Sequence, residues 1–140
     1  ELLPYVELHK KGLLKAVMVG HLINKNIDDV YPASLSEKFI QNILRDKIRF
    51  NGIVLSDDLH MSAVQKHYSF KEAVIHAVNA GVDIVVASKN MSKDYENNTA
   101  SQIQSIIFKA VRSGEIPISR INESFNRIIS IKRQFQIIDK

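Results

Sequence analysis

Three short apolar runs divide the chain, at residues 15–22, 50–56 and 82–87. Runs of this length that do not alternate with polar residues are typical of strands buried on both faces, as in a parallel sheet. Between and around these runs, apolar residues recur at the three- and four-residue spacing of amphipathic helices. The segments with this spacing are residues 2–8, 34–47, 70–80, 99–112 and 119–135.

Capping residues mark the ends of several predicted helices. Gly81 is suited to end the helix that precedes it, because glycine readily adopts a left-handed conformation. Ser34 or Ser36 is expected to open the second helix, and Ser34 with Glu37 has the spacing of a capping box. Ser119 is expected to cap the last helix.

The predicted elements alternate between helix and strand, which indicates an α/β fold with right-handed crossovers and a parallel sheet. Three strands are few for such a sheet, because both of its faces need cover and its open edges are costly. The chain is therefore either a small layered α/β protein or part of a larger one.

Polar side chains follow each predicted strand, where α/β folds place their active sites. His21 follows the first strand, Ser56, Asp57 and Asp58 follow the second, and Ser88 follows the third. Consecutive strand residues point to opposite sides, so one aspartate can face a pocket while the backbone or a cation holds the other. A structural or helix-capping aspartate is the alternative interpretation.

Composition excludes several classes of function. The 140 residues, 45% hydrophobic and 24% charged, suit one globular domain and exclude a disordered or collagen-like chain. No apolar run approaches the roughly 18–20 residues of a membrane span. The absence of cysteine excludes disulfides, thiolate catalysis and cysteine zinc sites. The net charge is +4, and the basic residues lie in short groups such as residues 45–49 and 127–133. Short groups favour solvated helix faces over a nucleic-acid surface.

One stretch of the sequence resembles a known active-site signature. Residues 43–57 resemble the signature of family 3 glycoside hydrolases: two aliphatic residues, a basic and a polar residue, then glycine, an aliphatic triplet, serine or threonine, and aspartate. The continuation through Asp58, Leu59 and Met61 resembles the bacterial β-N-acetylhexosaminidase branch that recycles peptidoglycan. Further segments agree in the family's order, at residues 3–5, 17–21, 28–36, 80–83 and 120–128.

This resemblance implies a fold and a set of site residues. The family's catalytic domain is a (β/α)8-like barrel, and residues 1–140 resemble its C-terminal portion, about three βα units with the closing helices. Asp57 corresponds to the nucleophile, which forms a covalent glycosyl-enzyme and gives retention. His21, Asp58 and Met61 are implied to bind the sugar. His60 departs from the signature, where this position is usually small or polar.

The family's general acid/base, a histidine paired with an aspartate in an upstream Lys-His-x-x-Gly-His-Gly-type segment, has no counterpart here. We therefore expect the chain to be inactive alone and to act with the N-terminal half of the same catalytic domain. The implied substrates are terminal β-linked N-acetylglucosaminides. No metal or cofactor, nucleic acid or membrane is expected. The branch implies a cytoplasmic enzyme, with a secreted or lipoprotein form left open. The alternative is a non-catalytic half-barrel that self-associates or binds a partner.

Overall fold

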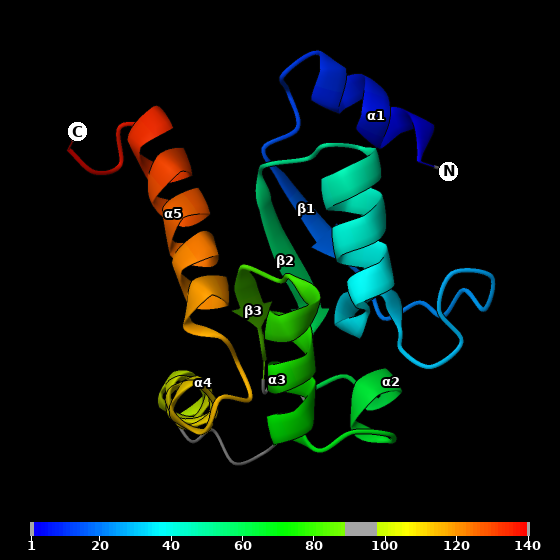
Figure 1. The fold of residues 1–140 in the computed structure, drawn as a ribbon, viewed down its shortest axis with the longest axis vertical. Helices are drawn as coiled ribbons and strands as arrows, with labels where there is room; N and C mark the ends of the chain where they lie inside the picture. Colours follow the sequence, from blue (N-terminus) through cyan, green and yellow to red (C-terminus); the bar gives the residue numbers. More distant parts are fainter. Residues whose placement is uncertain (1, 89–97, 140) are drawn as a thin grey trace.

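Three parallel strands form the centre of this α/β fold (Figure 1), which a computed structural model describes for residues 2–88 and 98–139. In chain order the elements are α1 (Leu3–Lys10), β1 (Ala16–Val19), the 3-10 helix η1 (Ala33–Leu35), the π-helix η2 (Lys38–Lys47), β2 (Ile53–Asp58), α2 (Ser62–Gln65), α3 (Phe70–Ala80), β3 (Ile84–Val86), α4 (Thr99–Ser113) and α5 (Ile118–Gln134). None of the helices within these ranges is long and apolar enough to span a bilayer.

The sheet has the strand order β1-β2-β3, with both neighbouring pairs parallel. Val19 of β1 lies opposite Ser56 of β2, and Leu55 of β2 lies opposite Ile84 of β3. The predicted α/β class and parallel sheet are therefore confirmed. The β2 strand extends further than predicted, because it includes both aspartates of the pair.

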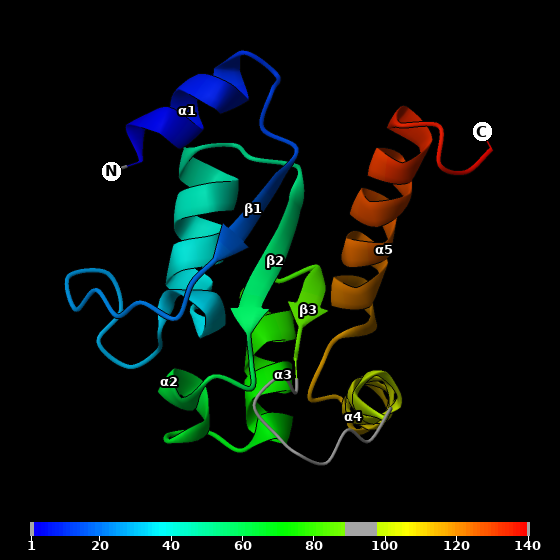
Figure 2. The same ribbon diagram turned by 180° about the vertical axis from the view of Figure 1, so that it is seen from behind.

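Helices cover one face of the sheet. In Figure 1 η2 and α3 lie in front of the strands, and Figure 2 shows the opposite face with no helix in front of it. Val17 of β1 and Val54 of β2 are buried in the main hydrophobic core. Met18, which alternates with Val17 along β1, is 57% exposed. The described part of the chain thus leaves much of the second sheet face open, although a parallel sheet requires cover on both sides.

The predicted helices are all present, but their predicted starts are only partly confirmed. The N-cap of the second helix is Glu37, which makes no side-chain capping bond, so the predicted capping box of Ser34 and Glu37 is wrong. Ser36, the other serine expected to open this helix, contacts its first turn, since its Oγ accepts the Phe39 N–H at 3.3 Å. That helix has π geometry over most of its length. Ser119 does not cap α5, because Pro117 is the N-cap and Ser119 already lies within the helix. The predicted polar loop over 88–99 falls mostly outside the described residues.

The helix α3 has strong signals at both ends. The Ser69 Oγ accepts the Glu72 N–H, and the Glu72 carboxylate accepts the Ser69 N–H, which completes a capping box that sequence inspection missed. Gly81 ends the helix with φ +115°, as predicted. A Cβ at Gly81 would also lie 2.8 Å from Ile40, so glycine additionally permits close packing of α3 against η2.

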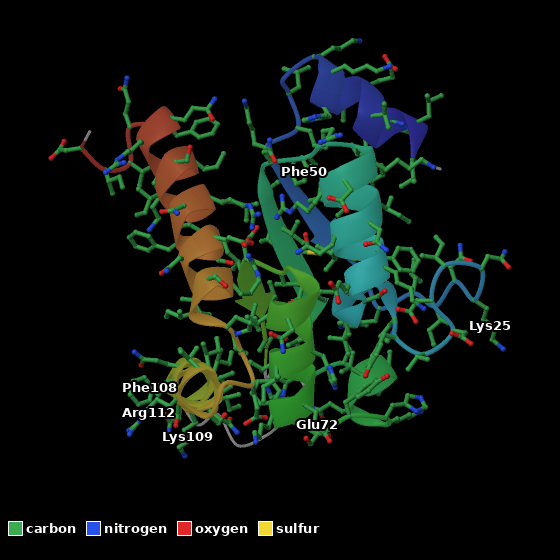
Figure 3. All side chains as sticks on the ribbon, viewed as in Figure 1. Lys25, Phe50, Glu72, Phe108, Lys109 and Arg112 are labelled. Atoms are coloured by element: carbon green, nitrogen blue, oxygen red, sulfur yellow. The ribbon has the colours of Figure 1, made fainter. Side chains whose placement is uncertain are left out.

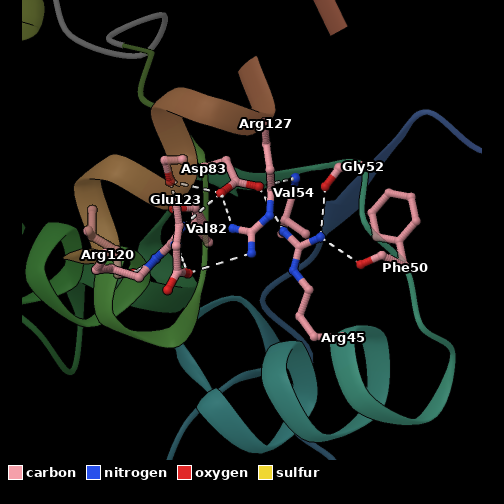
Figure 4. Close-up of polar contacts among 11 residues, drawn as sticks. Arg45, Phe50, Gly52, Val54, Val82, Asp83, Arg120, Glu123 and Arg127 are labelled. Atoms are coloured by element: carbon pink, nitrogen blue, oxygen red, sulfur yellow. Dashed lines mark hydrogen bonds and ion pairs between the residues drawn. The ribbon is translucent and has the colours of Figure 1, made fainter. Parts of the chain in front are cut away.

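A buried ion-pair cluster ties the amino end of β3 to two helices (Figure 4). Asp83, which precedes β3, contacts Arg45 of η2 at 2.8 Å and Arg120 and Arg127 of α5 at 2.7 and 3.0 Å. The Asp83 side chain is fully buried, and Arg45 and Arg120 are only 7% and 8% exposed. The prediction of solvated faces is therefore wrong for Arg45 and Arg127, because one buried carboxylate gathers these arginines.

Backbone and hydroxyl donors complete the coordination of Asp83. The Val54 N–H and the Ser124 hydroxyl donate to its two oxygens at 3.0 and 2.8 Å. Burial raises the pKa of the Asp83 carboxyl, but these donors and the arginines outweigh burial, so the pKa lies below its ordinary value. Glu123 adds a more exposed contact, 2.6 Å from Arg120. The cluster fixes α5 to the amino edge of the sheet, opposite the edge that carries the candidate site.

Candidate functional site

The candidate site lies at the carboxyl ends of the strands, beside α2 (Figure 2). Asp57 and Asp58 are the last two residues of β2. The parallel register brings Gly20, which follows β1, next to Asp57. A Cβ added to Gly20 would lie 3.9 Å from Asp57 Oδ2. By strand alternation Asp57 shares a face with Met18 and Leu55, so it projects from the uncovered face of the sheet.

The two oxygens of Asp57 have different surroundings. Oδ1 accepts the N–H of Asp58 at 2.8 Å. Within residues 2–88 and 98–139, no hydrogen bond reaches Oδ2. Asp57 is half-buried. A backbone donor thus orients one oxygen of the carboxylate, and the other oxygen has no protein donor among the described residues.

Asp58 is engaged by protein donors on both oxygens. Oδ1 accepts the N–H groups of His60 and Ser88, each at 2.9 Å, and Oδ2 accepts the Ser88 hydroxyl. Burial raises the pKa of the Asp58 carboxyl, but the Ser88 and His60 donors more than offset burial, so the pKa lies below its ordinary value. The Asp58 side chain therefore joins the end of β2 to the end of β3.

His21 is bonded through both nitrogens of its ring. Nδ1 lies 2.6 Å from Ser34 Oγ, and Nε2 lies 2.9 Å from the carbonyl oxygen of Asp58. Ser34 is fully buried in η1. The sequence placed His21 and Asp58 at the same edge but missed Ser34, because the spacing of Ser34 and Glu37 pointed to a helix cap instead.

Met61 and His60 follow the aspartates at the start of α2. Met61 is 44% exposed, and its role in sugar binding stays a prediction. The His60 ring packs on Phe70 with a centroid distance of 4.3 Å. Its Nδ1 lies 3.2 Å from Gln65 Nε2, while its Nε2 is buried without a hydrogen-bond partner among the described residues. This departure from the signature is thus packed against α2 and α3.

No group of three or more carboxylate or histidine side chains in the described ranges is arranged to hold a metal ion. At this edge of the sheet the Asp57 carboxylate lies on the open face. The neighbouring polar residues His21, Ser34, Asp58 and Ser88 hydrogen-bond to one another. Such an arrangement can supply an anionic nucleophile or a charge-stabilising group. Glycosidic bond cleavage needs a second carboxyl or equivalent acid on the other side of the bond.

Comparison with known proteins gives one matching family model, described as the glycosyl hydrolase family 3 N terminal domain, over residues 1–131. The chain is 35% identical over 113 residues to a beta-hexosaminidase of Tolumonas auensis, covering 76% of this chain and 34% of that protein. It is 38% identical over 86 residues to a beta-hexosaminidase of Actinobacillus pleuropneumoniae, covering 61% of this chain and 25% of that protein.

Solved structures agree with this match. The beta-N-acetylglucosaminidase of Thermotoga maritima superposes with a TM-score of 0.78 and 32% identity, covering 92% of this chain and 27% of the other. A family 3 beta-N-acetylglucosaminidase of Paenibacillus superposes with a TM-score of 0.81 and 30% identity, covering 93% of this chain and 24% of the other. The chain therefore spans about a third or less of the length of these relatives.

Proposed function

The chain belongs to glycosyl hydrolase family 3, and from this membership we propose that it forms the nucleophile-bearing part of a retaining exo-β-N-acetylglucosaminidase. In this proposal residues 1–140 are the C-terminal part of the (β/α)8-like catalytic barrel. The observation that carries the proposal is the position of Asp57. Its Oδ2 is unbonded among the described residues, on the uncovered sheet face, at the edge where barrel enzymes react.

The proposed reaction uses the two oxygens of Asp57 differently. Oδ2 attacks the anomeric carbon while Oδ1 stays bonded to the Asp58 N–H. The bond to the leaving oxygen breaks, and that oxygen takes a proton from an acid outside the described site. In the second step the group that gave the proton takes one back from water as the water oxygen attacks the anomeric carbon. The bond to Asp57 then breaks and the carboxylate is restored, which gives net retention.

The acid is proposed to come from upstream βα units of the same catalytic domain. A barrel of this type closes with eight strands, and the described sheet has three. The open sheet face would become the barrel interior. Apolar side chains on α4 and α5 also remain uncovered, with Phe108, Ile118 and Phe125 each 60% exposed. Figure 3 shows Phe108 on the side of α4 away from α3.

The names of the relatives support a terminal β-linked N-acetylhexosamine as the substrate. We propose that the enzyme acts on peptidoglycan fragments in the cytoplasm. The described residues supply the proposed nucleophile but no acid for the leaving group, so we expect the isolated chain not to turn over substrate. In this view Asp58 and Met61 lie beside the sugar, although the Asp58 carboxylate is already occupied by Ser88 and His60.

Asp57→Asn in the complete catalytic domain tests the proposal. The expected result is loss of turnover and loss of the covalent adduct that a fluorinated N-acetylglucosaminyl inactivator leaves in intact mass spectra. Asp46→Asn on the exposed side of η2 is the matched control and should keep both. An adduct that persists in Asp57→Asn would show that another residue is the nucleophile.

A second candidate function is a non-catalytic half-barrel that self-associates. The open sheet face and the exposed apolar residues of α4 and α5 favour it. Two copies would supply six strands, fewer than the eight that leave room for packed side chains in a barrel. Native mass spectrometry of the chain separates the possibilities, since a stable homodimer that takes no sugar adduct after addition of the upstream units would favour this function.

A further inference from the structure

We propose that His21 is a positioning residue, held as the neutral Nε2–H tautomer, that fixes the peptide unit behind the nucleophile. This inference rests on the proposed function of Asp57. It differs from the sugar-binding role that the family resemblance implies for His21. Three segments that are distant in the sequence meet at this ring: the end of β1, η1 and the end of β2.

The partners of the ring define its tautomer. A carbonyl oxygen can only accept a hydrogen bond, so the contact between Nε2 and Asp58 O at 2.9 Å requires a proton on Nε2. In the neutral ring Nδ1 is then an acceptor, and the Ser34 hydroxyl can donate to it at 2.6 Å. Ser34 is fully buried, and no other hydrogen bond of its hydroxyl exists within the described ranges. The neutral tautomer therefore satisfies both groups together.

The peptide unit bonded to His21 is restrained from its other side as well. Its carbonyl belongs to Asp58, and its N–H belongs to Leu59, which donates to Val86 O of β3 at 3.0 Å. Leu59 is completely buried. The Asp58 carbonyl also accepts the Met61 N–H at 2.9 Å. The peptide is thus held by the ends of β1 and β3 and by the start of α2, and His21 is its contact from the β1 side.

The preceding peptide unit orients the nucleophile. The Asp58 N–H donates to Asp57 Oδ1 at 2.8 Å. Because Asp58 supplies both this N–H and the carbonyl bonded to His21, a shift at His21 changes the direction of the donor that holds Asp57. A misplacement of about 1 Å in a reacting group can reduce the rate by about 10²-fold. His21 therefore acts on the reaction through the backbone rather than by contact with the sugar.

Two amide substitutions separate this role from a general loss of packing. The amide nitrogen of Gln reaches about as far as imidazole Nε2, so H21Q retains a donor to Asp58 O. The amide of Asn reaches only as far as Nδ1, so H21N retains contact with Ser34 but loses Asp58 O. The expected result in the complete domain is a fall in kcat of about 10²-fold for H21N with little change in KM, and recovery of most of that loss in H21Q. A rise in KM shared by both variants would identify a sugar ligand and overturn the proposal.

The tautomer can be measured on the 140-residue chain without any activity. In imidazole ¹⁵N–¹H spectra of the chain, we expect His21 to carry its proton on Nε2 alone at neutral pH. Exposed His67 provides an internal control and should show averaged tautomers. S34A should weaken the preference, because only the Asp58 carbonyl then selects the tautomer. A proton on Nδ1, or averaging at His21 like that at His67, would overturn the proposal even if Asp57 is the nucleophile. Conversely, an active Asp57→Asn variant with an intact Nε2–H signal would refute the proposed function and the effect of His21 on catalysis, while the tautomer and its contact with Asp58 would stand.

Discussion

Replacing Asp83 by Asn should destabilise the fold more than any surface charge change. The side chain of Asp83 is fully buried and contacts three guanidinium groups within 3.0 Å. Asp83→Asn leaves Arg45 without a counter-charge and leaves Arg120 with only the exposed Glu123, although both arginines are more than 90% buried. Removing one partner of a buried ion pair costs about 3–5 kcal/mol, because the remaining charge stays desolvated. That loss is a large fraction of a typical unfolding free energy of about 5–15 kcal/mol.

Urea unfolding followed by far-UV circular dichroism measures this loss. With a slope of about 2 kcal/mol per molar urea, the midpoint should fall by about 1.5–2.5 M. Glu123→Gln is the matched control, because Glu123 contacts Arg120 and Arg127 but is 52% exposed. Its expected cost is about 0–1 kcal/mol. Equal shifts for the two variants, or a shift below about 1 kcal/mol for Asp83→Asn, would refute the reasoning that burial makes Asp83 essential.

Three further predictions concern the packing and the charges of the same fold. Gly52→Ala should lower the unfolding free energy by about 1–3 kcal/mol in urea melts, since its Cβ would lie 2.3 Å from the backbone oxygen of Lys15; an unchanged midpoint would contradict this. Ser69→Ala should cost about 1 kcal/mol by removing the capping box of α3, and unchanged thermal unfolding would count against it. Burial raises the pKa of Asp28, but the Ser36 hydroxyl at 2.6 Å and backbone donors lower it below its ordinary value. Asp28 therefore stabilises the fold above about pH 4, and this contribution is lost as the pH falls through the lowered folded-state pKa. Asp28→Asn should make the unfolding free energy fall less steeply with pH below about pH 4. The same pH dependence in the variant and in the unchanged chain would exclude that role.

The three strands and the sheet edge that carries the candidate site could be predicted from sequence, because both follow from local patterns of apolar and polar residues. Apolar runs gave the three strands, and strand alternation indicated that Asp57 and Asp58 face opposite sides. In the structure Asp57 lies near Gly20, and the Asp58 carboxylate accepts the hydroxyl of Ser88, which follows β3. Helix ends were less predictable where two signals competed. The serine at position 34 has capping-box spacing, yet its hydroxyl contacts His21, whose position depends on the tertiary fold.

The ion-pair cluster was not visible in the sequence because its members come from segments that are far apart. Arg45 precedes Asp83 by 38 residues, and Arg127 follows it by 44. In sequence each arginine lies in a short basic group, which normally indicates a solvated helix face. Only the packing of η2 and α5 beside the start of β3 shows that the Asp83 carboxylate pairs with these side chains. Pairing over such separations is a property of the fold, so composition and local charge patterns cannot identify it.

The environments of Asp57 and Asp58 explain how adjacent carboxylates can take separate roles. The carboxylate of Asp58 accepts hydrogen bonds from the Ser88 hydroxyl and from the N–H groups of Ser88 and His60. Attack by this carboxylate would break three hydrogen bonds, two of which join the ends of β2 and β3. Asp57 keeps one oxygen without such a bond among the described residues, while the other is oriented by the Asp58 N–H. The carboxylate of Asp58 therefore secures the strand ends that position Asp57, the proposed nucleophile. This division predicts different consequences for the same chemical change: Asp58→Asn should weaken the junction between β2 and β3, whereas Asp57→Asn should remove reactivity and leave that junction intact.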